Sequence, residues 1–64
     1  MTAHEDPEMI DWLLGVVGGN SGSFLKSLAD AGLRADCENY PVLRPALLAM
    51  KAKYPNYTEM GRRP

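Results

Sequence analysis

The sequence predicts an all-α fold: three short helices in a small helical bundle. Its apolar residues recur at the three- and four-residue spacing of helices, and no run alternates as a strand would. Two segments rich in glycine or polar residues, 18–22 and 36–39, divide the chain into three helical stretches. At 64 residues the chain is one domain at most, and a domain of this size buries only about 60% of its unfolded surface.

A core this small is usually reinforced by a disulfide, a metal or a partner chain. Cys37 is the only cysteine, which excludes a disulfide framework. Together with the single histidine, His4, it supplies two of the four soft ligands of a closed zinc site. We therefore expect no metal and no cofactor, and we predict that homo-oligomerisation completes the bundle.

The first helix is predicted over residues 7–17. Asp6 can cap its free N–H groups, and Pro7 is compatible with a first helical position. Apolar residues cover nearly its whole circumference, which is typical of a helix buried on more than one side. Residues 1–6 before it are expected to be a mobile, solvated acidic end. The interface residues expected on this helix are Met9, Ile10, Trp12, Leu13 and Val16.

The second helix is predicted over residues 22–35. Gly18 or Gly19 suits the left-handed conformation that commonly ends a helix, and Ser21 or Ser23 suits the cap of the next one. Gly32 indicates either a close approach of another helix or the start of fraying. The expected inner face consists of Phe24, Leu28, Ala31 or Gly32, and Ala35, widened by Leu25 and Leu33.

The third helix is predicted over residues 41–54, with a tight or 3₁₀ first turn before Pro45. Residues 7–57 then form the helical domain, and residues 58–64 have the composition of a flexible basic tail. The tyrosines suit a binding interface because each offers apolar area and a hydroxyl, although ordinary packing at helix ends is the alternative. The predicted inner face is Leu43, Leu47, Met50 and Tyr54; the tyrosines considered for the interface are Tyr40, Tyr54 and Tyr57.

The glycine-rich segment around residues 18–23 raises the question of a phosphate site. Its spacing excludes both the P-loop and the dinucleotide-binding pattern, and no strand precedes it. It is then either a turn with a helix cap, or a loop whose free N–H groups contact an anionic ligand. The candidate ligand-binding residues are Gly18, Gly19, Asn20, Ser21, Gly22 and Ser23, with Arg34, Arg44 and Arg62 to pair with phosphate groups.

Other features argue against an enzyme. Cys37 has acidic neighbours and no nearby base, and the acidic cluster at residues 4–8 is expected to be solvated. The acidic start and the basic end of the chain can pair within one chain or between copies. The basic end is too small to predict nucleic-acid binding. No apolar run is long enough for a membrane span, no signal peptide is visible, and we expect a cytoplasmic protein.

The segments LRADCENYPVLRPALL (residues 33–48) and KAKYPNY (residues 51–57) resemble short uncharacterised helical proteins encoded in bacteriophage and bacterial genomes. The resemblance implies a phage-type accessory protein and carries over no site residue. The predicted function is a homo-oligomeric, non-enzymatic module that binds a host protein as an inhibitor or adaptor. One alternative is an oligomer that sequesters a phosphorylated small molecule or signalling nucleotide at inter-subunit sites, as an anti-defence sponge. A minor structural component of the virion is the second alternative.

Overall fold

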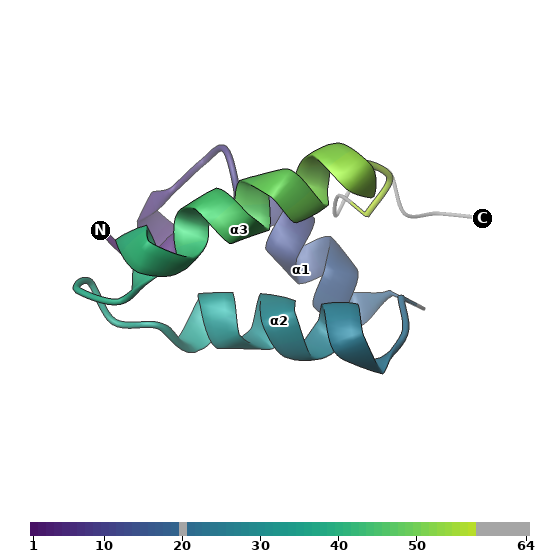
Figure 1. Ribbon diagram of the computed structural model, residues 1–64, viewed down its shortest axis with the longest axis horizontal. Coiled ribbons are helices and arrows are strands. Elements are labelled where there is room, and N and C mark those ends of the chain that lie inside the picture. The colour runs from purple at the N-terminus through teal and green to yellow at the C-terminus, as the bar shows by residue number, and fades with distance from the viewer. Residues whose placement is uncertain (20, 58–64) are drawn as a thin grey trace.

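A computed structural model describes residues 1–19 and 21–57, and the described part is helical with no strand. A short 3₁₀ helix, η1 (Ala3–Glu5), precedes α1 (Ile10–Gly18), α2 (Ser23–Arg34) and α3 (Tyr40–Lys53). Figure 1 shows α2 and α3 running antiparallel to each other, with α1 crossing behind them. The prediction of an all-α fold with three helices is confirmed. The basic tail, residues 58–64, lies outside the described residues, as does Asn20.

The chain packs against the core earlier than predicted. Ala3 has no exposed surface and Asp6 is 2% exposed, so the expectation of a solvated acidic end is wrong for these two residues. The physical reason is that Asp6 has charged and hydroxyl partners on α3, as described below. The regular helix begins at Ile10 rather than Pro7, because the carbonyl of Asp6 first accepts N–H groups of a turn, from Met9 at 3.0 Å and Ile10 at 2.9 Å.

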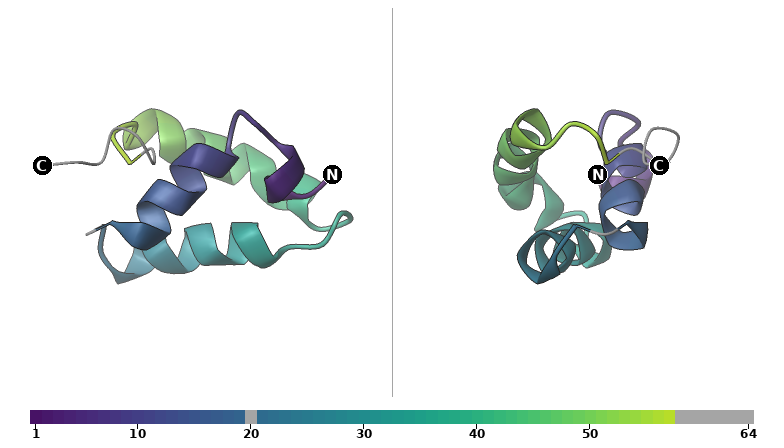
Figure 2. Two further views of the ribbon diagram at one scale, coloured as in Figure 1. Left: turned by 180° about the vertical axis from the view of Figure 1, so that it is seen from behind. Right: turned by 90° about the vertical axis from the view of Figure 1, so that its right-hand side faces the viewer.

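The core lies where the three helices and η1 meet, and the end-on view in Figure 2 shows how these elements are arranged around it. Gly32 of α2 lies at a close approach between helices: a Cβ there would lie 2.8 Å from Leu47 Cδ1 of α3 and 3.5 Å from Leu13 Cδ2 of α1. The interpretation of Gly32 as a site of close helix approach is therefore confirmed. The buried apolar residues are Ala3, Met9, Trp12, Leu13, Val16, Leu25, Ala29, Tyr40 and Leu47.

The buried side of α2 matches the predicted one only in part. Leu25, Ala29 and Gly32 are buried, whereas Phe24 and Ala31 of the predicted inner face are exposed. Leu25 and Gly32 belong to the predicted face, and Ala29 is next in sequence to the predicted Leu28, so the buried stripe is shifted toward the Leu25 edge of that face. The reason is tertiary: α1 and α3 both pack on α2, and the stripe between them is the one that becomes buried.

The connection between α1 and α2 also differs in detail. Gly19, which follows α1, has φ −99°, and the described residue with positive φ is Gly22 at 87°. Ser21 does not cap α2; its hydroxyl donates to the carbonyl of Val16 at 2.9 Å and so closes the end of α1 instead. Ser23 is already the first residue of α2. A glycine is needed at position 22 because other residues rarely adopt that φ.

The third helix is assigned as α-helix from Tyr40 rather than from about Pro45. Its first turn still contains a 3₁₀-type bond, as predicted: the N–H of Val42 donates to the carbonyl of Asn39 at 3.1 Å, beside the α-type bond from Leu43 at 3.2 Å. Pro45 lacks only the N–H that would reach Pro41, and Pro41 is exposed at the start of the helix. Asp36 stabilises the turn that precedes the helix, because its Oδ1 accepts the N–H groups of Asn39 at 2.8 Å and Glu38 at 3.1 Å. Asn39, the residue before the helix, makes no capping bond with its side chain.

Candidate binding surface

A pocket of about 330 Å³ lies between the start of α2 and the end of α3. Three aromatic rings line it, and backbone and hydroxyl groups of the glycine-rich segment supply its polar side. Phe24 is 68% exposed and Tyr54 38% exposed, so both rings present apolar surface to solvent. We call this feature the aromatic pocket. Its lining residues are Ser21, Gly22, Ser23, Phe24, Leu25, Tyr54 and Tyr57.

Contacts with α1 and α3 hold the tyrosine side of the aromatic pocket. The indole Nε1–H of buried Trp12 donates to the carbonyl of Tyr54 at 2.7 Å, and the N–H of Tyr54 donates to Met50 at 2.8 Å. The ammonium group of Lys53 lies 5.5 Å from the centre of the Tyr54 ring, within the range of a cation–π contact. The backbone at Tyr54 is thereby fixed to the core while its ring remains accessible.

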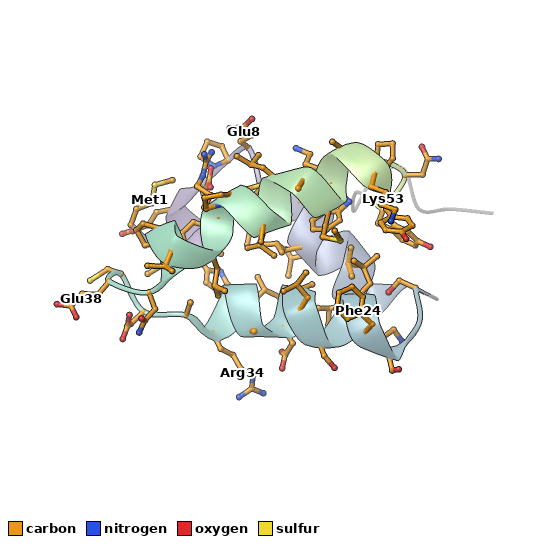
Figure 3. The ribbon with its side chains drawn as sticks, in the orientation of Figure 1. Met1, Glu8, Phe24, Arg34, Glu38 and Lys53 are labelled. Atoms are coloured by element: carbon orange, nitrogen blue, oxygen red, sulfur yellow. The ribbon has the colours of Figure 1, made fainter. Side chains whose placement is uncertain are left out.

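Beside the pocket, α2 and α3 carry further apolar side chains that are exposed or half-buried. On α2, residues 24, 28 and 31 lie on one stripe because they are four and three residues apart. On α3, Leu47 lies against Gly32 of α2, and Leu43 and Met50 are four residues before and three after it, so they flank that contact on the helix. Figure 3 shows Phe24 near the start of α2. We define the open face as Phe24, Leu28, Ala31, Leu43, Ala46 and Met50, all exposed or half-buried.

Aspartate 6 organises a second cluster, on the other side of α3. Its Oδ2 accepts the hydroxyl of Tyr40 at 2.7 Å and Nε–H of Arg44 at 2.8 Å. Arg44 also donates to Glu8 Oε1 at 2.6 Å, and Lys51 donates to the carbonyl of Glu8. The acidic start of the chain therefore pairs with the basic α3 within one chain. The sequence had left open whether this pairing occurs within one chain or between copies.

The electrostatics of this cluster follow from burial and charge. The hydrogen bond from Arg44 lowers the pKa of Asp6 below its usual value, against the effect of burial. Burial, followed by the hydrogen bond to the Asp6 carboxylate, raises the pKa of Tyr40 to about 12. The hydrogen bonds to Asp6 and Glu8 raise the pKa of Arg44 further above its already high value. Arg44 is thus a structural cation that fastens the N-terminal segment to α3.

The structure brings together only part of the predicted ligand site. Ser21, Gly22 and Ser23 line the aromatic pocket, whereas Gly18 and Gly19 end α1 and do not line it. Arg44 is occupied by the two carboxylates, and Arg34, at the far end of α2, pairs with Asp30 at 2.9 Å. Asn20 and Arg62 lie outside the described residues. The predicted grouping of the loop with Arg34 and Arg44 is therefore not seen within one chain, because folding gives each arginine a carboxylate of its own.

The predicted interface residues divide in the same way. Tyr54 and Tyr57 line the pocket, and Ile10 is half-buried. The other five have side chains with 0–1% exposure, because they pack in the core of the single chain. Most apolar side chains of the first helix pack against α2, α3 and η1. Leu14 and Val17 of α1 remain exposed. The five buried residues are Met9, Trp12, Leu13, Val16 and Tyr40.

The residue that sequence reasoning misplaced is Phe24, which was assigned to the core. The available signal was that α2 carries two adjacent apolar stripes, one through Phe24 and Leu28 and one through Leu25 and Ala29. Elsewhere, Cys37 is exposed with a free thiol. Among residues 1–19 and 21–57 no three metal-ligating side chains gather, and no helix there is long and apolar enough to cross a bilayer.

Comparisons with protein-family models, with curated proteins and with solved structures find no match for this chain. The functional argument therefore depends on the aromatic pocket and the open face themselves.

Proposed function

We propose that this protein is a non-enzymatic protein-binding module that uses the open face, with the aromatic pocket as the anchor site for a partner side chain. The observation that carries the proposal is the exposure of Phe24, 68% of whose surface faces solvent beside a pocket lined by two tyrosines. Full burial of such a side chain gains about 2 kcal/mol. A partner that buries the Phe24 ring gains this free energy on binding, because folding of the chain leaves the ring in solvent.

The character of the surface also supports binding to a protein. Aromatic side chains dominate the few residues that carry most of the energy of protein interfaces, and such residues pair with pockets on the partner. In contrast, Asp6 is buried, and its bonds to Tyr40 and Arg44 hold the N-terminal segment to α3. A phage-type accessory protein that inhibits or adapts a host protein fits this proposal, since it needs a complementary surface and no reactive group.

The test uses a displayed library of random peptides, selected on the folded protein. Peptides with an aromatic or aliphatic anchor should bind the wild-type protein, and binding should weaken about tenfold or more for Phe24→Ser, the loss expected for a buried aromatic contact. Val17→Ser is the matched control, because Val17 is also exposed but lies on α1. Peptides that bind Phe24→Ser as well as wild type would contradict the proposal.

A second candidate function is favoured by one observation: the serines and glycine of the predicted ligand loop do meet two tyrosines around a single pocket. Its volume of about 330 Å³ lies at the lower end of the range for small-molecule sites. On this alternative, the protein sequesters a phosphorylated small molecule. A thermal-shift screen with nucleotides, cyclic nucleotides and ADP-ribose derivatives tests it. A shift that Gly22→Val abolishes would support this candidate, and no shift with any compound would contradict it.

A further inference from the structure

We infer that the open face is the contact between two antiparallel copies of this chain, each copy covering α2 and α3 of the other. The inference names one partner for the surface proposed above and rests on that proposal. Three features of the described residues carry it: the placement of charge, the placement of the most exposed apolar side chains, and the dimensions of the face.

Charge is placed with opposite signs at the two ends of the open face. Lys53 lies at the end of α3, beside the aromatic pocket, and Glu38 lies in the connection at the opposite end, next to Asp36; Figure 3 shows Lys53 and Glu38 at these two ends. A two-fold axis that lies in the plane of the contact, perpendicular to the helices, places the end that carries Lys53 in each copy over the end that carries Glu38 in the other. A parallel arrangement would place like charges together. The formal net charge of −1 leaves little overall repulsion between copies.

The exposed apolar side chains follow the same arrangement. Val42 and Phe24 are the most exposed of the large hydrophobic residues, at 75% and 68%. Phe24 is near the start of α2 and Val42 near the start of α3, and these two starts lie at opposite ends of the molecule in Figure 1. Antiparallel pairing therefore brings Phe24 of one copy over the end that carries Val42 of the other.

The dimensions suit a small, specific dimer. The view in Figure 1 is down the shortest axis, so the side that shows α2 and α3 measures 35 by 22 Å. These are the extents of the whole molecule, so a contact of the standard size, ~800 Å² for each partner, would have to cover most of this side. The helices that form it, of 12 and 14 residues, are similar in length, so two antiparallel pairs overlap along most of their length.

The experiment is sedimentation equilibrium of the full chain at low salt, with charge-reversal variants. Lys53→Glu and Glu38→Lys each create two like-charge contacts in an antiparallel dimer and should weaken it about tenfold, since a surface pair contributes at most ~1 kcal/mol. An equimolar mixture of the two variants restores both contacts in the heterodimer and should dimerise like wild type. Lys26→Glu is the matched control, because residue 26 is two positions from both Phe24 and Leu28 and projects from another side of α2.

The outcomes separate the two proposals. A wild-type chain that remains monomeric at about 1 mM, a concentration that would populate even a weak dimer, overturns the inference; Phe24-dependent peptide binding would still support the proposed function. A dimer whose charge-reversal variants are not rescued by mixing overturns the antiparallel arrangement. A dimer restored by mixing and weakened by Phe24→Ser supports the inference, even if no peptide is selected. Circular dichroism of each variant confirms that the helices are retained.

Discussion

Replacing Asp6 by asparagine tests whether the N-terminal segment is held to the core by charge. The substitution keeps the shape of the side chain and removes its charge. In the wild-type protein this carboxylate is 2% exposed and accepts hydrogen bonds from Tyr40 at 2.7 Å and Arg44 at 2.8 Å. The uncharged amide leaves Arg44 facing a weaker acceptor, and it presents an N–H₂ group where two donors already point. We expect a large loss of stability.

The magnitude follows from burial. Breaking a fully buried ion pair costs about 3–5 kcal/mol. Arg44 retains 30% of its side-chain exposure and keeps its bond to Glu8, so water and Glu8 compensate part of the loss. We therefore expect about 2–3 kcal/mol. A chain of 64 residues has a total free energy of unfolding of only about 3–10 kcal/mol, so the effect is readily measured.

The assay is urea unfolding followed by the fluorescence of Trp12 and by circular dichroism. Asp30→Asn is the matched control, because Asp30 also pairs with an arginine at 2.9 Å but both side chains are at least half exposed. Its expected cost is about 0.5 kcal/mol or less. A loss below about 0.5 kcal/mol for Asp6→Asn, or equal losses for the two variants, would refute the assignment of Asp6 as a buried anchor.

The same variant has a defined pH dependence. The pKa of Asp6 is lower in the folded protein than its usual value of 3.8, so its stabilising contribution is fully present above that value. The contribution is lost as the pH falls through the lowered, folded-state pKa. The difference between wild type and Asp6→Asn should therefore shrink in that acid range. A difference that stays constant from neutral to strongly acidic pH would show that shape, and not charge, accounts for the loss.

Three further predictions concern other residues. Raising the pH from 10 to 12 should remove about 2 kcal/mol of stability, because the pKa of Tyr40 is about 12 in the folded chain and near 10 in the unfolded chain. Denaturant titrations at the two pH values should show a smaller loss for Tyr40→Phe. Gly32→Ala should lower stability by about 1 kcal/mol, because its Cβ would lie 2.8 Å from buried Leu47, which outweighs the gain in helix propensity; a rise in Tm would contradict this. Gly22→Ala should cost about 1 kcal/mol through its φ of 87° alone, since nothing lies within 4 Å of the added atom, and chemical denaturation measures it.

The local features of the fold were predictable because local chemistry decides them. Three helices, and a break at each glycine or polar segment, follow from apolar spacing. The i, i+4 pair of Asp30 and Arg34 follows from helix geometry and is observed at 2.9 Å. The candidate site was predictable only in part. The glycine-rich segment and two of the tyrosines were identified, but nothing local indicated that they meet around one pocket, because Ser21 and Tyr57 are 36 residues apart in the chain.

The sequence by itself determined that this chain is helical, where its helices break, and that it carries more apolar surface than three small helices easily bury. Only the tertiary structure decided which apolar stripe of α2 is buried, and therefore that Phe24 faces solvent. It also decided that Asp6, whose carboxylate still accepts the N–H of Glu8 at 3.2 Å, is a buried anchor rather than a solvated side chain. The reason is the same in both cases. Periodicity fixes which residues share a face, but the choice between adjacent faces, or between water and a partner 38 residues away, depends on contacts that only the folded chain provides.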